Sequence, residues 1–537
     1  MRFDRIHSAN PRLSLLTIAI VSIAACAHSA GVCWPFGIIF QQGSTLWWLQ
    51  LASLAVLCWQ LSRAASARQA AAIGLVFATV WLSATFWWLY IAMHTYGDLN
   101  SLITVVAIVA LAAALGVYYA AACAAFWRFS DTSPWLASLV FAAAWTGAEM
   151  ARGTWLTGFG WGAVGYAHVD GPLAAYIPWL GAYGVGALAA WLAATLATTV
   201  AAAVASIAPT TTVFFGSKTP GAWVGAAATA AIILGVGVWA PQGLGQWSTT
   251  AGRLSVTLLQ GNIPQDEKFQ PSTGVRDALL WYGAQLQRST SQLVVAPETA
   301  IPLLPQQLPD GYWEALQQHF STGKQAAMVG IPLGSYSQGY TNSVVSLSAN
   351  SVEPLRYDKH HLVPFGEFIP PMFRWFTRLM NIPLGDFNRG AVGQPSLAWQ
   401  GQQLAPNICY EDLFGEELGA RFVNPALAPT IFVNVSNIGW FGNTVAIDQH
   451  LNISRMRALE FERPFVRATN TGATAILDHR AHVVAQLPRL TRGVLDGVVE
   501  GRTGTTPFAW WVSRFGLWPL WLAVIGVLAF AWRRRGP

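Results

Sequence analysis

The chain is poor in charge. Only 10% of its 537 residues are Asp, Glu, Lys or Arg, against roughly 25% in an ordinary soluble domain. Residues 1–250 hold eight Lys or Arg and five Asp or Glu, and 53% of the whole chain is apolar or aromatic. This composition excludes a disordered chain, a coiled coil and a typical soluble enzyme. Residues 251–514 carry no net charge, so no basic cluster predicts a nucleic-acid partner.

Several motifs that indicate a cofactor or a metal are also missing. The sequence has no Gly-rich fingerprint after a predicted strand, no Walker loop, no HExxH and no repeat of solenoid length. No His, Cys, Asp and Glu residues cluster at metal-ligand spacing. We therefore expect neither a metal nor a cofactor.

Long apolar runs are present. A helix needs about 17–25 apolar residues to cross a bilayer, and each run has close to that length or more. They lie near 11–28, 46–63, 70–93, 101–127, 135–151, 174–206, 221–241 and 516–532. We predict a membrane domain over 1–245 with about seven transmembrane helices, and a C-terminal transmembrane helix with a basic tail over 510–537. The run 174–206 is too long for one straight span, so its ends should tilt or project.

The positions of Lys and Arg predict the orientation in the membrane. If there are eight spans, one side receives Arg2, Arg5, Arg12, Arg63, Arg68, Arg128, Lys218 and Arg533–Arg535, whereas Arg152 stands alone in the short loops of the other side. Both termini are then cytoplasmic, and the domain between the last two spans lies on the opposite side. Glu149 and Arg152, at the outer end of one span, form either a functional site or a structural ion pair.

A soluble domain is predicted over 250–505, where short β-rich runs alternate with amphipathic helices. Strands are expected at 254–260, 292–296, 326–331, 343–347, 404–410, 430–435, 473–477 and 482–486, and helices at 274–288, 311–320 and 446–463. This alternation predicts a layered α/β or α+β domain. The helix 446–463 is expected to be an amphipathic packing helix with surface ion pairs.

Cys409 is the first candidate catalytic residue. The other four cysteines (Cys26, Cys33, Cys58 and Cys123) lie in or beside apolar spans, so Cys409 has no partner for a disulfide within its domain. It ends a strand-like run and precedes Tyr-Glu-Asp. A buried Cys often acts only as a small hydrophobe, but the polar residues after Cys409 favour a nucleophile where a strand opens into a site.

Two further residues could assist a thiol nucleophile. Glu298 follows the apolar run 293–297, so we expect a general base whose pKa is raised by its apolar surroundings; a helix N-terminal acid is the alternative. Lys359 lies in an apolar loop punctuated by Pro and Gly, where its cation could stabilise a thiolate and an oxyanion.

Glu298, Lys359 and Cys409, in this order and each near a strand end, resemble the Glu-Lys-Cys triad of the nitrilase superfamily. The surrounding segments are APETA (296–300), YDKHHLVPFGE (357–367) and NICYEDLF (407–414). Together with the membrane flanks, with EMARGTWLTGFGWGAVGYA (149–167), with LLQGNIPQDEKFQ (258–270) and with the segment 436–472, they make the chain similar to the apolipoprotein N-acyltransferases of the bacterial inner membrane.

This resemblance implies a nitrilase-like α-β-β-α sandwich on an extracytoplasmic (periplasmic) side, attached to a multi-span α-helical membrane domain. It implies that a phospholipid donates an acyl chain to Cys409, and that the thioester then acylates the N-terminal amino group of diacylglyceryl-cysteine in an apolipoprotein. By match to the motifs, Glu298 is the base, Lys359 the oxyanion partner and Cys409 the nucleophile. Glu367, Tyr410 and Glu411 are supporting residues.

The substrate entrance is predicted from an apolar stretch and from two family motifs. Residues 364–387 are rich in aromatics, Pro and Gly, which favours a lid that dips into lipid, carrying Phe368, Phe373 and Trp375, over a core helix and loop. Phe269 and Trp440 complete the predicted entrance. The chain departs from the family pattern at two places: Phe269 stands where Trp is frequent, and Ile438-Gly439 stand where Asp-Ala is usual.

Two other functions are compatible with parts of the sequence. A membrane-tethered nitrilase-like amidase would use the same triad to hydrolyse a C–N bond, but it needs neither an apolar lid nor eight spans. A transporter or sensor should show several buried charges or repeated halves in its spans, and only Glu149 is clearly inside.

Overall fold

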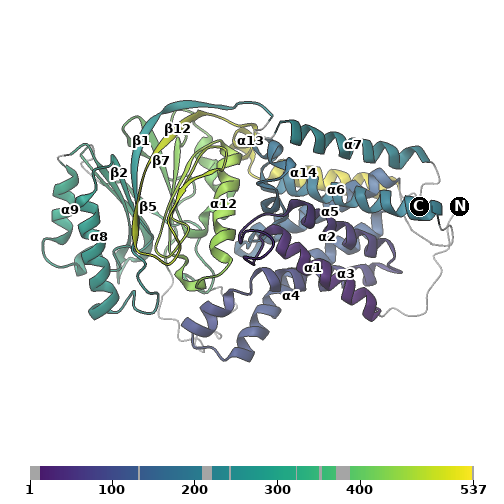
Figure 1. Ribbon diagram of the computed structural model, residues 1–537, viewed down its shortest axis with the longest axis horizontal. Coiled ribbons are helices and arrows are strands. Elements are labelled where there is room, and N and C mark those ends of the chain that lie inside the picture. The colour runs from purple at the N-terminus through teal and green to yellow at the C-terminus, as the bar shows by residue number, and fades with distance from the viewer. Residues whose placement is uncertain are drawn as a thin grey trace. The chain divides into compact units, whose positions relative to one another are not determined.

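The computed structural model describes residues 13–130, 133–207, 220–240, 244–321, 323–349, 354–369 and 387–534. The described chain forms two compact units (Figure 1). The helical unit comprises the described residues up to Trp87, Leu102–Leu244 and those from Leu517 onward. The sandwich unit comprises Trp88–Ser101 and Gly245–Gly516.

Each predicted apolar run overlaps a helix of the helical unit. The bounds are α1 Leu15–Val32, α2 Trp47–Ser62, α3 Ala67–Thr85, α4 Ser101–Phe129, α5 Pro134–Thr154, α6 Ile177–Ile207, α7 Pro220–Trp239 and α14 Trp518–Arg534. By length and composition, four described helical stretches could cross a membrane: Leu15–Val32, Ala67–Thr85, Ser101–Phe129 and Pro172–Ala201. A fifth is counted if α13 (Pro507–Phe515) and α14, bent by 87°, form one span. The number of eight spans therefore stays a prediction.

Two of these helices differ from the expected spans. Helix α3 ends at Thr85, and the residues after it form a π-helix, η1 (Ile91–Tyr96), which belongs to the sandwich unit. Helix α6 is broken at Gly181, where φ is +66°, a backbone conformation that glycine adopts without strain. The break divides the run 174–206, which the sequence predicts to be too long for one straight span.

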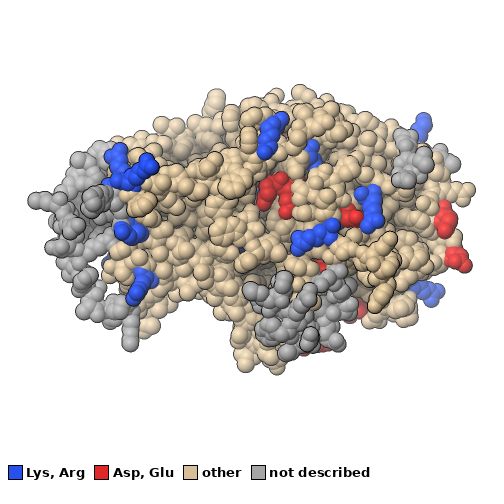
Figure 2. All heavy atoms as spheres, turned by 180° about the vertical axis from the view of Figure 1, so that it is seen from behind, with Lys and Arg blue, Asp and Glu red and all other residues tan. Residues whose placement is uncertain are grey.

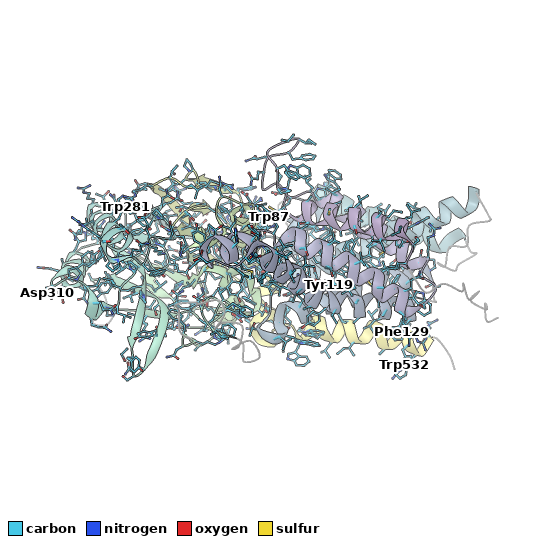
Figure 3. The ribbon with its side chains drawn as sticks, turned by 90° about the horizontal axis from the view of Figure 1, so that it is seen from below. Trp87, Tyr119, Phe129, Trp281, Asp310 and Trp532 are labelled. Atoms are coloured by element: carbon cyan, nitrogen blue, oxygen red, sulfur yellow. The ribbon has the colours of Figure 1, made fainter. Side chains whose placement is uncertain are left out.

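Aromatic side chains fill the middle of the helical unit. Trp81 and Trp145 stack with ring centroids 5.9 Å apart, and Tyr119 packs against both. Figure 3 places Tyr119 along the length of the unit and Phe129 and Trp532 at its end. Exposed arginines lie at the corresponding helix termini: Arg63, Arg68, Arg128, Arg533 and Arg534. Figure 2 shows Lys and Arg gathered at that end of the helical unit.

The sandwich unit contains two six-stranded sheets. The first has the order β12-β1-β2-β3-β4-β5, with β1 Ser248–Gln260, β2 Leu293–Ala296, β3 Ala326–Ser335, β4 Gly339–Ser348, β5 Arg356–Asp358 and β12 Gly493–Gly504. The second has the order β11-β10-β9-β8-β7-β6, with β6 Leu397–Trp399, β7 Gln402–Ile408, β8 Ile431–Ser436, β9 Phe465–Thr469, β10 Ala475–Leu477 and β11 Val483–Gln486. In each sheet three central strands are parallel and the outer strands are antiparallel.

The sheets pack face to face and helices cover their outer faces (Figure 1). The core between the sheets includes Val256 and Val295 of the first sheet and Ile408 and Val433 of the second. Helices α8 (Arg276–Arg288) and α9 (Tyr312–Ser321) pack on the outer face of the first sheet. The predicted α-β-β-α sandwich is therefore confirmed.

Helix α12 (Ala446–Phe461) covers the second sheet and is buried on nearly all sides. The expected surface ion pairs are wrong for this helix, because its Arg457 and Glu460 pair at 2.8 Å while both are buried. Helix α12 is therefore a buried helix, and its polar side chains must be satisfied by protein groups.

Candidate active site

The three residues of the predicted triad meet where three strands end. Glu298 follows β2, Lys359 follows β5 directly, and Cys409 follows β7 and opens the 3₁₀ helix η8 (Cys409–Leu413). Each side chain is thus carried by a loop that a buried strand holds in place. Strand ends of adjoining sheets are a common position for catalytic side chains, because rigid elements position them accurately.

Lys359 is buried and contacts two carboxylates. Its Nζ lies 3.2 Å from Oε1 of Glu298 and 2.9 Å from Oε1 of Glu367. The side-chain amide of Asn342, on β4, donates to the same two oxygens at 2.7 Å each. The second oxygen of Glu298 accepts the backbone N–H of Asn437 at 2.8 Å. The cation and the amide therefore hold the two carboxylates together.

The pKa of Glu298 is lowered, so the expectation of a raised value is wrong. Burial opposes ionisation, but Lys359, the amide of Asn342 and Lys268 together favour the carboxylate and bring the pKa below its usual value. Conversely, although burial opposes its charge, Glu298 and Glu367 raise the pKa of Lys359 well above its usual value. The resting site contains a carboxylate and an ammonium ion.

Cys409 occupies a strained turn. Its φ is +53°, a left-handed conformation that costs a non-glycine residue about 1 kcal/mol or more and is frequent at functional sites. Burial, and secondarily the charge of Glu298, raise the pKa of its thiol to about 12, opposed by Lys359 and a hydrogen bond with Ser436. The thiol is therefore protonated at rest and must lose its proton as it attacks.

Lys268 is a residue of this site that the sequence analysis did not single out. It is 2% exposed, and its Nζ donates to the backbone carbonyl of Glu298 at 3.1 Å. Burial lowers its pKa to about 8, while Glu298 and Cys409 act in the opposite direction. Lys268 lies in the segment 258–270, which resembles the family, and this position was the feature of the sequence that could have identified it. The site therefore has two buried lysines.

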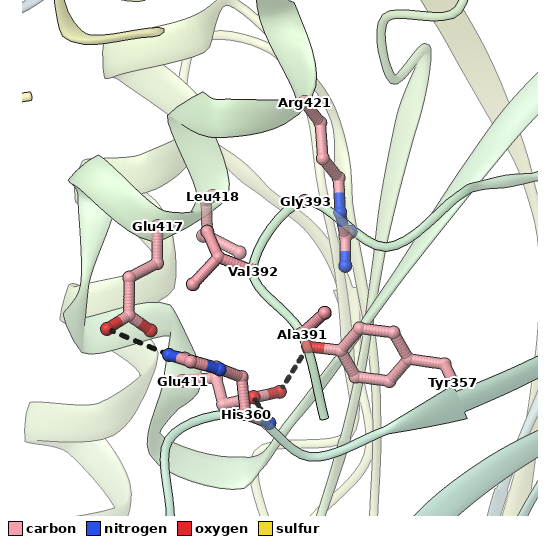
Figure 4. Close-up of a pocket in the computed structure, with 9 residues that line it drawn as sticks. All are labelled: Tyr357, His360, Ala391, Val392, Gly393, Glu411, Glu417, Leu418 and Arg421. Carbon is pink, nitrogen blue, oxygen red and sulfur yellow. Dashed lines mark hydrogen bonds and ion pairs between the residues drawn. The ribbon is translucent and has the colours of Figure 1, made fainter. Parts of the chain in front are cut away.

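Glu411 connects the nucleophile turn to the loop of Lys359. One of its oxygens accepts the backbone N–H groups of His360 and His361, at 2.6 and 3.1 Å. The other accepts the N–H of Ile408 at 2.7 Å and the hydroxyl of Tyr357 at 2.8 Å. Figure 4 shows Glu411 and Tyr357 lining a small pocket beside this connection. Glu411 is saturated with donors, so it positions the loops and has no free oxygen for a substrate.

The other predicted residues lie as follows. The Tyr410 hydroxyl donates to the carbonyl of Leu362 at 3.3 Å. Phe269 is 48% exposed, Phe368 and Trp440 are partly buried, and Phe368 lies under the guanidinium of Arg389. Phe373 and Trp375 lie outside the described residues, as does most of the predicted lid. Among the described residues, no group of three or more His, Cys, Asp or Glu side chains could hold a metal.

This arrangement suits nucleophilic attack on a carbonyl carbon. Glu298 is ionised and can accept the thiol proton, Cys409 can supply a nucleophile, and Lys359 can supply positive charge to an oxyanion.

Two family models and several solved structures match parts of this chain. Residues 30–195 match the family model described as apolipoprotein N-acyltransferase N-terminal domain, and residues 255–507 match the model described as carbon-nitrogen hydrolase. Among solved structures, yeast Nit3, a member of the nitrilase superfamily, is 14% identical with a TM-score of 0.34, over 47% of this chain and 91% of its own.

Curated relatives match over nearly the whole chain. The apolipoprotein N-acyltransferase of Verminephrobacter eiseniae is 55% identical over 92% of both chains. That of Ralstonia nicotianae is 42% identical over 91% of this chain and 90% of its own, and that of Neisseria meningitidis serogroup A is 35% identical over 84% and 86%. On the strength of this identity, this coverage and both domain matches, the chain belongs to the apolipoprotein N-acyltransferase family.

Proposed function

We propose that the chain transfers a fatty acyl group from a membrane phospholipid to the N-terminal amino group of diacylglyceryl-cysteine in an apolipoprotein, through a thioester on Cys409. The observation that carries this proposal is the cluster of Glu298, Lys359 and Cys409, in a chain that also contains a unit of apolar helices. Family membership supports the acceptor, and the apolar helices support a lipid donor.

In the first half-reaction, the Cys409 sulfur attacks the ester carbonyl of the phospholipid while Glu298 accepts the thiol proton. The resulting oxyanion lies near the Lys359 ammonium, which is stabilising because the site is buried. The C–O bond then breaks, and Glu298 returns the proton to the leaving alkoxide. The products are a thioester and a lysophospholipid.

In the second half-reaction, the amine of the acceptor attacks the thioester. The attacking nitrogen must be a free amine, so an α-ammonium, whose pKa is about 8, first loses one proton. Glu298 takes the second proton as the C–N bond forms. The C–S bond breaks, and Glu298 returns this proton to the Cys409 thiolate, which restores the resting site. A thioester suits this exchange, since an amine attacks it readily when water is excluded.

The amidase alternative uses the same triad with water in the second step. Relatives named apolipoprotein N-acyltransferase over nearly the full length do not favour it. An amidase that hydrolyses a soluble amide also has no need of the apolar helices.

We further propose the orientation predicted from charge: an inner-membrane protein with cytoplasmic termini and the sandwich unit in the periplasm. Lys and Arg side chains gather at one end of the helical unit (Figure 2), and Phe129 and Trp532, the neighbours of Arg128 and Arg533, lie at one end of it in Figure 3, which supports this orientation. In this proposal 1–245 and 510–537 are the membrane parts and 250–505 is catalytic. Reporter fusions near residues 65 and 130 should report cytoplasm and one at 300 periplasm; a cytoplasmic signal at 300 would overturn it.

We also keep Phe269, Phe368 and Trp440 as the proposed entrance for the acyl chain, with Phe373 and Trp375 in the same predicted lid. Replacing Phe368 by Ser should weaken the use of bilayer phospholipid more than that of a short, water-soluble thioester donor. Equal loss with both donors would mean that Phe368 only packs in the core.

The central experiment uses intact mass spectrometry. Purified protein is incubated with phospholipid alone, and a diacylated lipopeptide with a free N-terminus is added afterwards. A fatty-acyl adduct should accumulate on Cys409 and then pass to the peptide. If wild-type protein never carries the adduct, the proposed mechanism is wrong.

A further inference from the structure

A second set of buried polar side chains lies behind the nucleophile. It consists of Asp412 on η8, His450 and Ser454 on α12, and Arg467 on β9, and each is at most 1% exposed. The mechanism above gives none of them a role. Two of them, His450 and Ser454, lie on α12, the helix for which the sequence predicted surface ion pairs.

The hydrogen bonds in this set fix the ring of His450. An Arg467 Nη donates to Nδ1 of His450 at 3.0 Å; a guanidinium can only donate, so this nitrogen must be the acceptor. The ring proton therefore lies on Nε2. Nε2 is 3.0 Å from Oδ1 of Asp412, whose other oxygen accepts from Arg467 at 3.0 Å and from Ser454.

The same Nε2 of His450 also lies 3.2 Å from the backbone carbonyl oxygen of Cys409. That oxygen accepts a second hydrogen bond, 2.9 Å long, from the side-chain amide of Asn434. Two buried donors thus hold the carbonyl of a residue whose backbone is in the left-handed region. Without them, the turn could relax toward an ordinary conformation.

The orientation of this carbonyl determines that of the next amide. The carbonyl of Cys409 and the N–H of Tyr410 belong to one planar trans peptide group, so they point in opposite directions. Tyr410 lies in the first turn of η8, where backbone N–H groups have no partner within the helix. An N–H fixed beside the nucleophile can donate to the oxyanion formed on the attacked carbon.

We propose that His450, fixed by Asp412 and Arg467, is a positioning residue that holds the Cys409–Tyr410 peptide group in the orientation needed to stabilise the oxyanion of acyl transfer. This inference rests on the proposed thioester mechanism. It predicts that His450 affects attack on a carbonyl, in which an oxyanion forms, much more than attack on a saturated carbon, in which none forms.

Two closely related variants test the proposal. In His450→Gln, the side-chain amide nitrogen can occupy the position of Nε2 and donate to the Cys409 carbonyl. In His450→Asn, the shorter side chain reaches only the position of Nδ1, so it can still accept from Arg467 but cannot reach Cys409. His319→Gln, on α9 outside this set, serves as the control.

Two rates are measured for each protein in detergent: acylation of Cys409 by phospholipid, and alkylation of Cys409 by iodoacetamide. Thermal unfolding reports the folded fraction. We expect His450→Asn to acylate roughly 100-fold more slowly, with alkylation near the wild-type rate. We expect His450→Gln to recover most of the loss, and His319→Gln to behave as wild type.

The outcomes separate this inference from the proposed function. Absence of an acyl adduct on wild-type protein contradicts the mechanism itself. If wild type is acylated but His450→Asn matches it, or if His450→Asn loses acylation and alkylation equally, His450 has no such positioning role. If His450→Asn does not fold, His450→Gln still tests the proposal. The Gln amide should replace the Nε2 donor, so a His450→Gln protein that loses acylation but keeps alkylation contradicts the proposal.

Discussion

Buried charge has different partners in the two units. In the helical unit, Arg152 donates to the hydroxyl of Tyr119 and to the backbone carbonyls of Phe159 and Trp161, while Glu149 accepts the backbone N–H of Val164. In the sandwich unit, by contrast, Lys359 contacts two carboxylates, and Asp412 contacts Arg467 and His450.

The partners of a buried charge indicate whether it stabilises the fold or can take part in proton transfer. The guanidinium of Arg152 binds the carbonyls of Phe159 and Trp161 and so holds the segment that follows α5. Backbone carbonyls cannot exchange protons with it. Carboxylates bound to an ammonium ion instead have pKa values that depend on one another, so a change at one group alters the others. The contacts of Arg152 indicate a structural role, but through carbonyls and the Tyr119 hydroxyl: among the described contacts none is the ion pair with Glu149 that the sequence left open.

The largest expected effect is the loss of the acyl adduct when Cys409, but not a cysteine of the helical unit, is replaced. Cys409→Ala should remove the acyl adduct completely, because no other group carries the acyl chain. Cys26→Ala, at an exposed position of α1, should leave adduct formation unchanged. Mass spectrometry after incubation with phospholipid measures both. An adduct that persists in Cys409→Ala would place the nucleophile elsewhere.

Lys359→Ala should slow acylation by about 3 kcal/mol in the barrier, roughly 100-fold, because the oxyanion loses its cation. It also leaves Glu298 and Glu367 close together without the ammonium between them, so the pKa of Glu298 should rise. Single-turnover acylation measures the first effect. A loss below about fivefold, under 1 kcal/mol, would mean that Lys359 only neutralises the carboxylates.

Arg152→Met is the matching test in the helical unit. The Tyr119 hydroxyl and the backbone carbonyls of Phe159, Gly160 and Trp161 lose their buried donor, so we expect a loss of stability of about 3 kcal/mol, seen as a lower midpoint of thermal unfolding in detergent. The acylation rate per folded molecule should stay near that of wild type. A selective loss of acylation without loss of stability would give Arg152 a role in catalysis.

The sequence predicted elements best where a run had one clear period. The eight expected strands all exist, because alternating or continuous β-branched residues mark them, and the carboxyl-terminal ends of β2 and β7 placed Glu298 and Cys409. Strands β5 and β6 have three residues each and lie in no longer β-rich run, whereas the equally short β10 lies in the expected run 473–477. Strand β9 contains the buried Arg467, a charge that argues against a core strand until its partner Asp412 is known.

The electrostatics of the site could not be predicted in the same way. Glu298 follows an apolar strand, which indicated a raised pKa, yet Lys359, Asn342 and Lys268 come from segments up to 61 residues away along the chain and reverse the shift. His450 is likewise one of six histidines in residues 251–514, and nothing in their spacing from Cys409 singles it out. Its contact with the Cys409 carbonyl depends on how α12 packs on β7–β9.

The smallest expected effect is that of Lys268 on the pKa of Glu298. Its cation is one of the groups that hold the pKa of Glu298 below the usual value. Lys268→Met removes that charge, so the pKa of Glu298 should rise. Because the base must be ionised, the acidic limb of the acylation rate should move to higher pH, by up to about one unit, an interaction of roughly 1.4 kcal/mol.

The alkaline side of the profile should behave differently. The pKa of Lys268 itself is about 8, so wild-type protein loses this cation as pH rises through that value, and the two proteins should converge above it. Lys268→Arg, which stays charged, should keep the wild-type acidic limb, and Lys324→Met, at an exposed position, should change nothing. An acidic limb that stays in place or moves to lower pH in Lys268→Met would mean that Lys268 binds the Glu298 carbonyl only to hold the loop.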